Sequence, residues 1–295
     1  MTTYRFIDAE KAHEPVRFLC RVLSVSRAAY YAWKARKTWS ARRAQDAALA
    51  VHIRAIWKRA RETYGSPRMT VELKAEGHEV GRRRVARLMR EHGLKGTPSK
   101  RFRGSTTDSK HAAPVAPNLL ERDFHTDKPN VVWVGDITYL PTRAGWVYLA
   151  ILLDLFSRKV VGWELATHMR DDLCLEALRR AVATRSPSPG LIHHTDRGSQ
   201  YASSDYQKAL SDISAKPSMS RKGDCWDNAC AESFFGTLEQ ELGAKANWAD
   251  ETEAREAVSD YIHKFYNPVR RHGTLGHVSP VDFEEQYRVH QNMAA

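Results

Sequence analysis

Three acidic residues in the second half of the chain have the residue type and the setting of metal ligands. Asp136 lies inside an apolar run, and Asp196 follows another such run in a loop that contains glycine. Glu232 follows small residues that would let a helix approach a sheet closely. A charge inside an apolar strand is costly unless it is paired or binds a cation. Carboxylates from three separate elements supply the hard oxygen ligands that Mg²⁺ requires, so these residues predict a metal site.

The chemistry expected of such a site is the breaking and joining of phosphodiesters. Two cations about 3.5–4 Å apart can activate an attacking oxygen and stabilise a leaving oxygen. Each acid alone also has an ordinary structural explanation. Asp136 could pair with a buried arginine, Asp196 could pair with Arg197, and Glu232 could lie on a helix surface. The three acids together favour a catalytic site.

The elements that would position these acids follow the order of an α/β domain. Alternating or continuous apolar residues indicate strands, and capping residues before a 3.6-residue period indicate helices. The pattern predicts helices over residues 171–183, 205–210 and 227–242, and strands over 131–140, 146–154, 159–165, 191–195 and near Ile213. This succession predicts a mixed five-stranded sheet with flanking helices.

The amino-terminal part of the chain differs from this domain in its charge. The 295-residue chain carries a net charge of +11, yet residues 1–110 hold 26 of its 46 lysines and arginines beside 10 acids. That segment has a net charge of +16, and residues 111–295 have a net charge of −5. Basic charge gathered at one end indicates a nucleic-acid-binding module joined to another domain. A merely soluble basic protein, or one associated with ribosomes, would show the same total charge.

Helical spacing predicts that this basic part is an all-α, helix-turn-helix region. The expected helices cover residues 14–23, 27–35, 45–61, 66–77 and 82–93. The first two form either part of a helix-turn-helix or an ordinary hairpin. The last helix carries clustered arginines, and the second helix of a helix-turn-helix enters the major groove. DNA contacts are therefore predicted for Arg82, Arg83, Arg84 and Arg87, although a solvated helix face would also explain them.

Composition excludes several classes of protein. A chain with 42% hydrophobic and 9% aromatic residues is not predominantly disordered. No apolar run approaches the roughly 18 residues of a membrane span, and the amino end lacks an apolar stretch of signal-peptide length. Four cysteines, none of them spaced Cys-x2-Cys, do not make a disulfide framework. A reducing cytoplasm and no membrane association are expected.

The order and sequence of several motifs resemble one protein family. The spacing Asp136-x59-Asp196-x35-Glu232 is similar to that of the DDE transposase and retroviral integrase superfamily. Over residues 14–285 the chain resembles the second-reading-frame (OrfB) proteins of the bacterial insertion-sequence-three family. The motifs that carry this resemblance are Trp133–Thr138, Asp154–Trp163, His194–Tyr201, Ser218–Gly223, Asp227–Ala229, Glu232–Phe235 and Tyr266–His272.

The resemblance implies a DNA transposase with an RNase H-like catalytic core. It implies two Mg²⁺ or Mn²⁺ ions per site, with Asp136 bridging both and Asp196 and Glu232 each holding one. Such an enzyme cleaves the ends of an insertion sequence and joins the 3′-OH to DNA. The implied partners are DNA (terminal inverted repeats and target), an OrfA protein or an OrfA–OrfB fusion, and further copies of the chain in a homo-oligomer on DNA. A bacterial cytoplasm, at the nucleoid, is the expected location.

Pattern and resemblance together divide the chain into five segments. These are a short helical segment with a partial helix-turn-helix (1–40), a helix-turn-helix DNA-binding domain (41–96), a basic linker (97–129), an RNase H-like integrase catalytic core (130–245) and a C-terminal helical extension (246–295). Further contacts with DNA phosphates are expected from Arg197, Arg221, Lys222, Arg270 and Arg271.

The sequence departs from the family at a few positions. Glu239 stands where relatives usually carry Lys or Arg, and a carboxylate there would repel DNA phosphates. Gly135 stands where relatives often carry Thr or Ala, a change expected to be tolerated. Cys225 and Cys230, together with the adjacent residues His193 and His194, are an alternative set of zinc ligands. Two other functions stay open: an RNase H-like nuclease that cuts without joining, and a DNA-binding regulator derived from an inactivated transposase.

Overall fold

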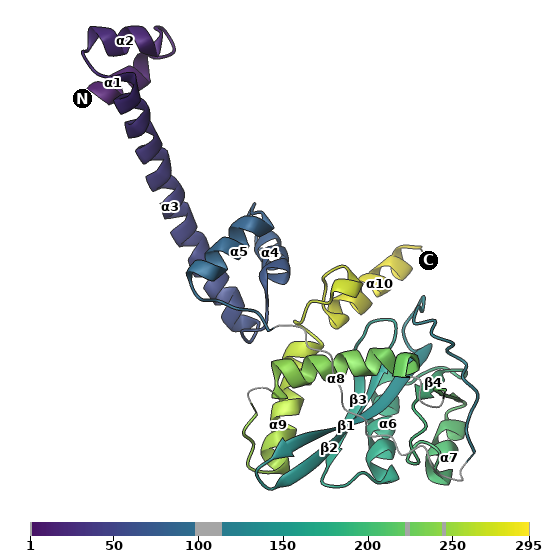
Figure 1. The fold of residues 1–295 in the computed structure, drawn as a ribbon. Helices are drawn as coiled ribbons and strands as arrows, with labels where there is room; N and C mark the ends of the chain where they lie inside the picture. Colours follow the sequence, from purple (N-terminus) through teal and green to yellow (C-terminus); the bar gives the residue numbers. More distant parts are fainter. Residues whose placement is uncertain (1, 98–113, 222–224, 244–245, 295) are drawn as a thin grey trace. The chain divides into compact units, whose positions relative to one another are not determined.

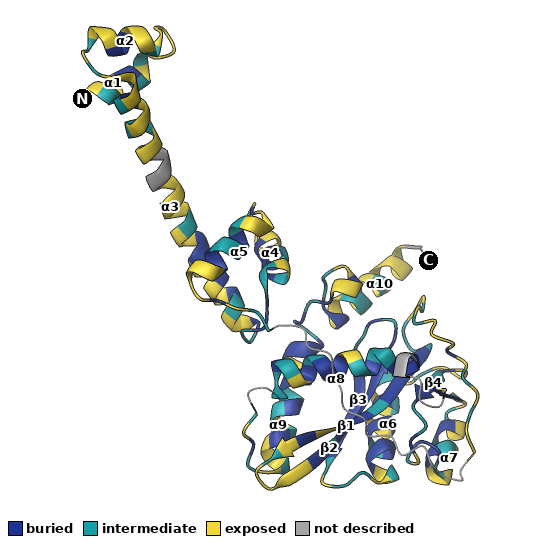
Figure 2. Cartoon of the chain, in the orientation of Figure 1, coloured by how far each residue is buried: buried dark blue, intermediate teal, exposed yellow. Residues whose placement is uncertain are grey.

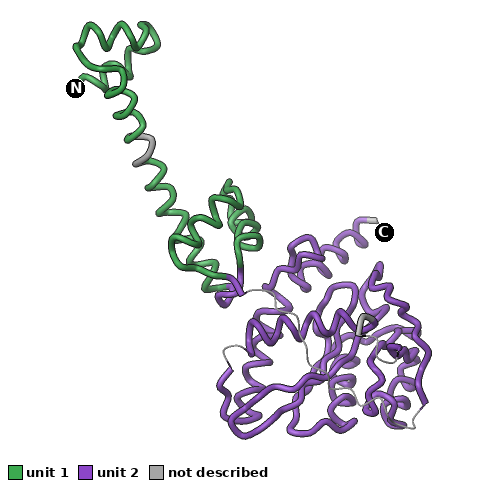
Figure 3. Tube along the Cα trace, in the orientation of Figure 1, with its two compact units in different colours: residues 1–59, 65–95 green, residues 60–64, 96–295 purple. Residues whose placement is uncertain are grey.

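The computed structural model describes residues 2–97, 114–221, 225–243 and 246–294. The chain divides into two compact units, the first made of residues 1–59 and 65–95 and the second of residues 60–64 and 96–295 (Figure 3). The middle of the predicted basic linker, residues 98–113, lies outside the described residues. Within the described ranges, no helix is long and apolar enough to cross a membrane.

The first unit is all-helical (Figure 1). Its helices are α1 (Thr3–Glu10), α2 (Val16–Val22), α3 (Arg27–Arg59), α4 (Ser66–Ala75) and α5 (Arg82–Glu91). The helices expected over 27–35 and 45–61 are one continuous helix, so the expected break between them is wrong. Residues 36–44 contain neither glycine nor proline, and their intrinsic preferences do not end a helix. The boundary predicted between residues 40 and 41 falls inside α3.

Two small apolar cores pack against the two ends of α3. At its amino-terminal end, α1 and α2 contribute to a cluster of Ile7, Leu19, Cys20 and Tyr30. Near its carboxyl end, α3 contacts both α4 and α5, and the residues buried there include Ile53, Ile56, Met69, Leu73, Val85 and Leu88. Much of the helix between the two cores is exposed (Figure 2).

The predicted pair of short helices is confirmed in α4 and α5. Gly77 ends the first of them with a φ of +85°, and Gly93 follows the second with a φ of +67°. Both values lie in the left-handed region, which glycine adopts without steric cost. The amino-terminal cap of α4 is Gly65, one residue before the expected Ser66, so proline stands at the second helical position. The turn at Gly77 thus separates α4 from α5, and Gly93 marks the end of the helix pair.

The second unit contains the predicted mixed five-stranded sheet. Its strands are β1 (Val132–Thr142), β2 (Gly145–Asp154), β3 (Val160–Ala166), β4 (Ile192–Thr195) and β5 (Lys216–Met219), in the spatial order β3-β2-β1-β4-β5. The pairs β1–β2 and β2–β3 are antiparallel, and the pairs β1–β4 and β4–β5 are parallel. The last strand begins three residues after Ile213, which caps the preceding helix instead. Ser214, with a φ of +55°, then turns the chain into β5.

Helices cover both faces of this sheet (Figure 1). On one face, α6 (Asp171–Arg185) and α7 (Ser204–Asp212) share a core with Trp133 and Ile137 of β1. A Cβ on Gly162 of β3 would lie 2.3 Å from the carbonyl oxygen of Ala177, so only glycine lets α6 approach this strand. On the opposite face, α8 (Ala229–Glu241) contacts β1. Successive residues of a strand alternate between faces, so β1 presents Val134, Asp136 and Thr138 to the side of α8.

Longer helical elements follow α8 in the C-terminal part of the chain. They are α9 (Glu251–Tyr261), a π-helical turn (Ile262–Tyr266) and α10 (Pro280–Ala294). Arg270 lies beyond this turn and is 5% exposed, with its Nε and Nη2 donating to Glu241 of α8 at 2.8 and 2.9 Å. Tyr261 of α9 donates its hydroxyl to the same carboxylate at 2.8 Å. The carboxyl end of α8 is thereby tied to the C-terminal segment.

A buried histidine lies next to β1 on the α7 side of the sheet. A Cβ on Gly135 would lie 2.9 Å from the ring of His193 on β4, so the imidazole occupies the space that a side chain at 135 would need. The Nε2 of His193 is 2.7 Å from the hydroxyl of Tyr206. Burial lowers the pKa of His193 to about 3, and the charge of neighbouring His194 acts in the same direction. The glycine at 135 is therefore matched to the histidine at 193.

The low pKa of His193 predicts an acid-dependent loss of stability. In the unfolded chain, His193 binds a proton near the ordinary histidine pKa of about 6.5. In the folded chain it stays neutral until about pH 3. The free energy of unfolding is therefore unaffected by this histidine above about pH 6.5 and falls as the pH is lowered from there towards 3. Urea unfolding at a series of pH values measures how steeply the unfolding free energy falls with pH. We expect His193→Gln to make this slope shallower by roughly 1.4 kcal/mol per pH unit below about pH 6.5.

The matched control for this experiment is His125→Gln, because the side chain of His125 is 82% exposed. This control should retain the pH slope of the parent chain. Equal slopes for the two variants would contradict the assignment of the acid sensitivity to His193.

Candidate active site

The first predicted metal ligand, Asp136, lies in the middle of β1 on the face covered by α8. Its side chain is half-buried, and its Oδ1 accepts a hydrogen bond from the backbone N–H of Ile137 at 2.8 Å. Burial raises the pKa of Asp136 well above its usual range, and the negative charges of Asp196 and Glu232 raise it further. The structure therefore brings the three predicted acids within electrostatic reach of one another.

Asp196 reaches this place through the register of the parallel strands. Val134 of β1 pairs with His194 of β4, and each predicted aspartate stands two residues further along its strand. Neighbouring strands are about 4.8 Å apart, so Asp136 and Asp196 come side by side at the same level of the sheet. Asp196 directly follows β4, and its Oδ1 accepts a hydrogen bond from the N–H of Gly198 at 2.9 Å. This hydrogen bond orients the carboxylate within the turn that follows β4.

Glu232 stands in the first turn of α8. Ala231, beside it, is fully buried where the helix faces the unit's interior. Sequence analysis left open that Asp136 pairs with a buried arginine, that Asp196 pairs with Arg197, and that Glu232 lies on a helix surface. Among the described residues that shift the pKa of Asp136, the charges are those of two acids, and no arginine contributes. A half-buried group of three carboxylates fits a divalent cation, because a cation would offset their mutual repulsion.

The start of α8 is held by a residue that sequence analysis treated only as part of a motif. Asp227 is fully buried, and it accepts hydrogen bonds from Asn118 at 3.0 Å and Arg122 at 3.2 Å. Arg221 donates to it through its backbone N–H at 2.9 Å and through Nε and Nη2 at 3.1 and 3.0 Å. Hydrogen bonds from Arg221 hold the pKa of Asp227 well below its usual range. An aspartate at the first residue of the helix predicted over 227–242 was the available signal for this role.

The predicted phosphate contacts of the second unit have different surroundings. Arg221 is bound to Asp227, yet its side chain remains 54% exposed. The Nε of Arg197 donates to the backbone oxygen of Ser220 at 2.8 Å. The Nη1 of Arg271 donates to the backbone oxygen of His277 at 2.7 Å, and Lys222 lies outside the described residues.

One of these predicted contacts is contradicted by the structure. Arg270 is buried, and its Nε and Nη2 each donate a hydrogen bond to the carboxylate of Glu241. A guanidinium enclosed with its counter-ion cannot reach a DNA phosphate without leaving a buried carboxylate unpaired. The prediction that Arg270 contacts DNA is therefore wrong, and this arginine instead anchors the end of α8.

The arginines of α5 fall into two sets. Arg82 and Arg83 are exposed at the start of the helix. Arg84 and Arg87 instead pair with Asp46 of α3, at 2.7 and 2.6 Å. Partial burial opposes the ionisation of Asp46, but these two arginines hold its pKa below the ordinary value. The structure thus separates two arginines that face solvent from two that join α5 to α3.

Two further predictions concern the surroundings of α8. Glu239 is exposed on this helix, two turns after Glu232. The zinc alternative is not supported by the histidines, because both ring nitrogens of His194 are hydrogen-bonded to serine hydroxyls, at 2.8 and 3.1 Å. The Sγ of Cys230 accepts a hydrogen bond from Arg158. The side chain of Cys225 lies outside the described residues.

Comparison with protein families assigns both units. A model described as integrase core domain matches residues 126–225, and a second model with the same description matches residues 214–280. A model described as HTH-like domain matches residues 44–102, the part that contains α4 and α5. These matches agree with a helix-turn-helix region followed by an integrase-type catalytic core.

Solved structures with a similar arrangement come from retroviral integrases. The chain is similar to the simian T-cell lymphotropic virus intasome in complex with the PP2A regulatory subunit B56 gamma, with a TM-score of 0.44 and 16% identity over 75% of this chain and 70% of the other. It is also similar to the HTLV-2 integrase catalytic core domain in complex with magnesium, with a TM-score of 0.42 and 17% identity over 54% of this chain and 99% of the other.

Curated relatives match nearly the whole chain. The chain is 44% identical to an insertion element IS600 uncharacterized 31 kDa protein of Shigella sonnei, over 91% of this chain and 98% of the relative. It is 40% identical to the transposase InsF for insertion sequence IS3A of Escherichia coli (strain K12), over 96% of this chain and 98% of the relative. The chain therefore belongs to the IS3 family of insertion-sequence transposases and is a DDE-type DNA transposase.

Proposed function

We propose that this transposase cleaves the ends of its insertion sequence and joins the 3′-OH to target DNA at a site formed by Asp136, Asp196 and Glu232. The observation that carries this proposal is the parallel register of β1 and β4, with Asp136 on the first strand and Asp196 directly after the second. Burial and the charges of Asp196 and Glu232 together raise the pKa of Asp136. Acids from a strand, a strand end and a helix converge on one face of the sheet. Repulsion among them gives the site its affinity for divalent cations, Mg²⁺ or Mn²⁺, two per site.

Each acid has a distinct part in this site. When bound, two such cations activate the attacking oxygen and stabilise the leaving oxygen of a phosphodiester. Asp136, whose pKa both other acids raise, would contribute oxygens to both cations. Asp196 and Glu232 would hold one cation each. The backbone N–H groups of Ile137 and Gly198 orient the two aspartates by hydrogen bonds at 2.8 and 2.9 Å.

DNA binding is assigned to the exposed basic residues of both units. In the first unit these are Arg82 and Arg83 at the amino end of α5, where a recognition helix contacts base edges and phosphates. In the second unit the exposed guanidinium of Arg221 is the strongest candidate, with Arg197 beside it at Ser220. Terminal inverted repeats, target DNA, an OrfA protein or OrfA–OrfB fusion, and other copies of this chain complete the proposed assembly.

Substitution of the three acids tests the proposed site. We expect Asp136→Asn, Asp196→Asn and Glu232→Gln each to lower cleavage and joining of a labelled terminal-repeat oligonucleotide in Mg²⁺ by about a thousandfold, equivalent to about 4 kcal/mol of transition-state stabilisation. DNA affinity should change little, because these acids bind cations. Without divalent cations, Asp136→Asn should raise the thermal midpoint, since it removes a repelled charge.

The matched control is Glu239→Gln, which neutralises another acid of α8 and should join DNA at least as well as the parent chain. Cleavage near the parent rate in Glu232→Gln would refute the assignment. A parent chain that cuts but never joins would indicate a nuclease, and a parent that binds without cutting would indicate a regulator.

The two sets of arginines in α5 predict two different phenotypes. Arg82→Gln with Arg83→Gln should weaken DNA binding by the full-length chain and lower the salt dependence of log K by about 2, because two phosphate contacts are lost. Its stability should stay near that of the parent. Arg84→Gln with Arg87→Gln should instead lower the thermal midpoint, because partly buried Asp46 loses both partners. Filter binding over a salt series and thermal unfolding would distinguish the two variants.

The exposed carboxylate of Glu239 predicts a gain of function. Glu239→Lys removes a charge that repels phosphate and adds one that attracts it, so we expect several-fold higher DNA affinity or joining yield at low salt. The gain should shrink as salt rises, because exposed charges are screened. Glu239→Gln should give an intermediate gain. A loss of joining in Glu239→Lys would show that this carboxylate serves the reaction.

A further inference from the structure

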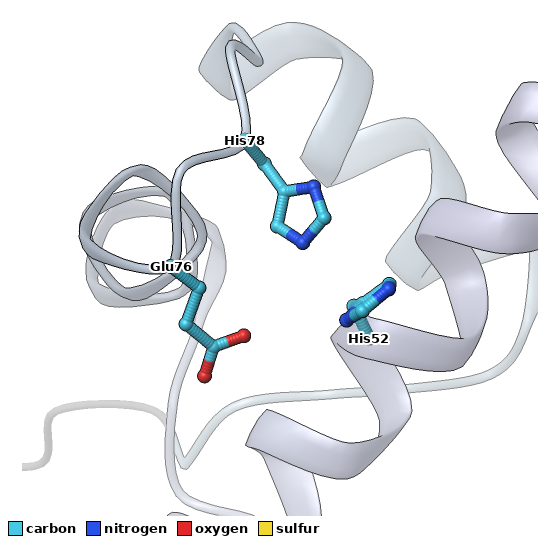
Figure 4. A group of neighbouring side chains, drawn as sticks. All are labelled: His52, Glu76 and His78. Carbon is cyan, nitrogen blue, oxygen red and sulfur yellow. The ribbon is translucent and has the colours of Figure 1, made fainter.

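A second set of metal-ligating side chains lies in the first unit, away from the acidic site. His52 comes from α3, Glu76 caps the carboxyl end of α4, and His78 stands in the turn before α5. Each offers one ligand atom, and these atoms all lie within 4.8 Å of one another. Figure 4 shows the three side chains directed into the same space. Such spacing matches ligands that surround a single ion.

The fold explains why these three residues meet. Ile53, next to His52, is fully buried, which places His52 at the edge of the face that α3 packs against α4 and α5. Gly77 adopts a φ of +85° and reverses the chain after α4. The backbone N–H of His78 then donates to the oxygen of Leu73 at 2.8 Å. This turn brings the side chains of 76 and 78 to the same side, facing α3.

The two imidazoles are close without bonding to each other. Their ring centroids are 4.4 Å apart, and the rings are inclined at 60°. Within the described part of the chain, neither ring has a hydrogen-bond partner. The inclined arrangement can direct one nitrogen of each ring toward a common point, as two histidine ligands of one ion require.

The carboxylate of Glu76 is oriented by a neighbouring arginine. Its Oε1 accepts a hydrogen bond at 2.7 Å from Nη2 of Arg59, which lies two turns after His52 on α3. A carboxylate has two oxygens, so one can stay with Arg59 while the other meets a cation. Partners that hold metal ligands in this way are common in metal sites. His52 and Glu76 are exposed, so an ion can enter from solvent.

We propose that His52, Glu76 and His78 form a binding site for a divalent transition-metal ion, with Zn²⁺ as its occupant. Imidazole nitrogens favour Zn²⁺ over Mg²⁺, which prefers oxygen ligands. Two histidines and one glutamate leave a fourth tetrahedral position for water. The ion would join α3 to the turn between α4 and α5 and so stabilise the first unit.

The test uses the full-length chain in which the acidic site has been silenced. In the background Asp136→Asn, Asp196→Asn, Glu232→Gln, metal-free protein is titrated with Zn²⁺ against a chromophoric chelator. We expect one Zn²⁺ per chain, not displaced by millimolar Mg²⁺. Loss of a residue that only hydrogen-bonds a metal ligand lowers metal affinity ~10-fold to 100-fold. His52→Gln or His78→Gln in this background removes a ligand itself, so each should weaken Zn²⁺ binding by at least that factor. His92→Gln, an exposed histidine of the same unit, should bind as the background does.

Two further measurements test the proposal by readouts other than the affinity for Zn²⁺. Co²⁺ in place of Zn²⁺ should give visible absorption bands of a nitrogen-ligated site. Zn²⁺ should raise the thermal midpoint of the background and of His92→Gln, but not of His52→Gln. Absence of stoichiometric Zn²⁺ in the background, or equal affinity in His52→Gln, would overturn the proposal. None of these measurements involves DNA, so their failure would leave the proposed joining reaction untouched.

Discussion

Repulsion among three carboxylates is the constraint on which the second unit depends. Asp136 is half-buried on a central strand, and both burial and its two acidic neighbours oppose its ionisation. Flexible segments would relieve that repulsion by moving apart. A hydrogen-bonded sheet prevents this, because Asp136 and Asp196 occupy adjacent strands whose register is set by the pairing of Val134 with His194. The repulsion that costs stability in the free protein becomes affinity when cations bind.

The third acid depends on a helix that is anchored at both ends. Asp227, just before α8, binds Asn118, Arg122 and Arg221. Glu241, the last residue of α8, is bound by Arg270 and Tyr261. Removing one partner of a buried ion pair costs on the order of 3–5 kcal/mol. Both ends of α8 are therefore difficult to displace, and Glu232 near its start keeps its position against β1.

Exposure decides which of the many arginines can serve DNA. The first 110 residues carry a net charge of +16, but part of that charge is used inside the protein. Arg84 and Arg87 neutralise Asp46 and join two helices, whereas Arg82 and Arg83, on the same helix, face solvent. In the second unit, Arg270 is likewise internal, while much of Arg221 stays accessible. Some of the positive charge thus holds this protein together, and some of it stays exposed to solvent.

The sequence alone determined the strands and helices of the second unit, the elements at which the three acids stand, and the paired helices of the first unit. It could do so because the apolar period and the placement of glycine and proline are local features of the chain. The same local rules placed a break in α3 that does not exist, and they began the last strand near Ile213 rather than at Lys216. Tertiary structure alone decided that Arg270 is internal, that Asp227 anchors α8, and that His52 meets Glu76 and His78. Most of these contacts join residues that are far apart in the chain, and the others depend on which face of a helix a side chain occupies. The residue types alone do not predict such contacts, because the contacts form only when the helices and strands pack.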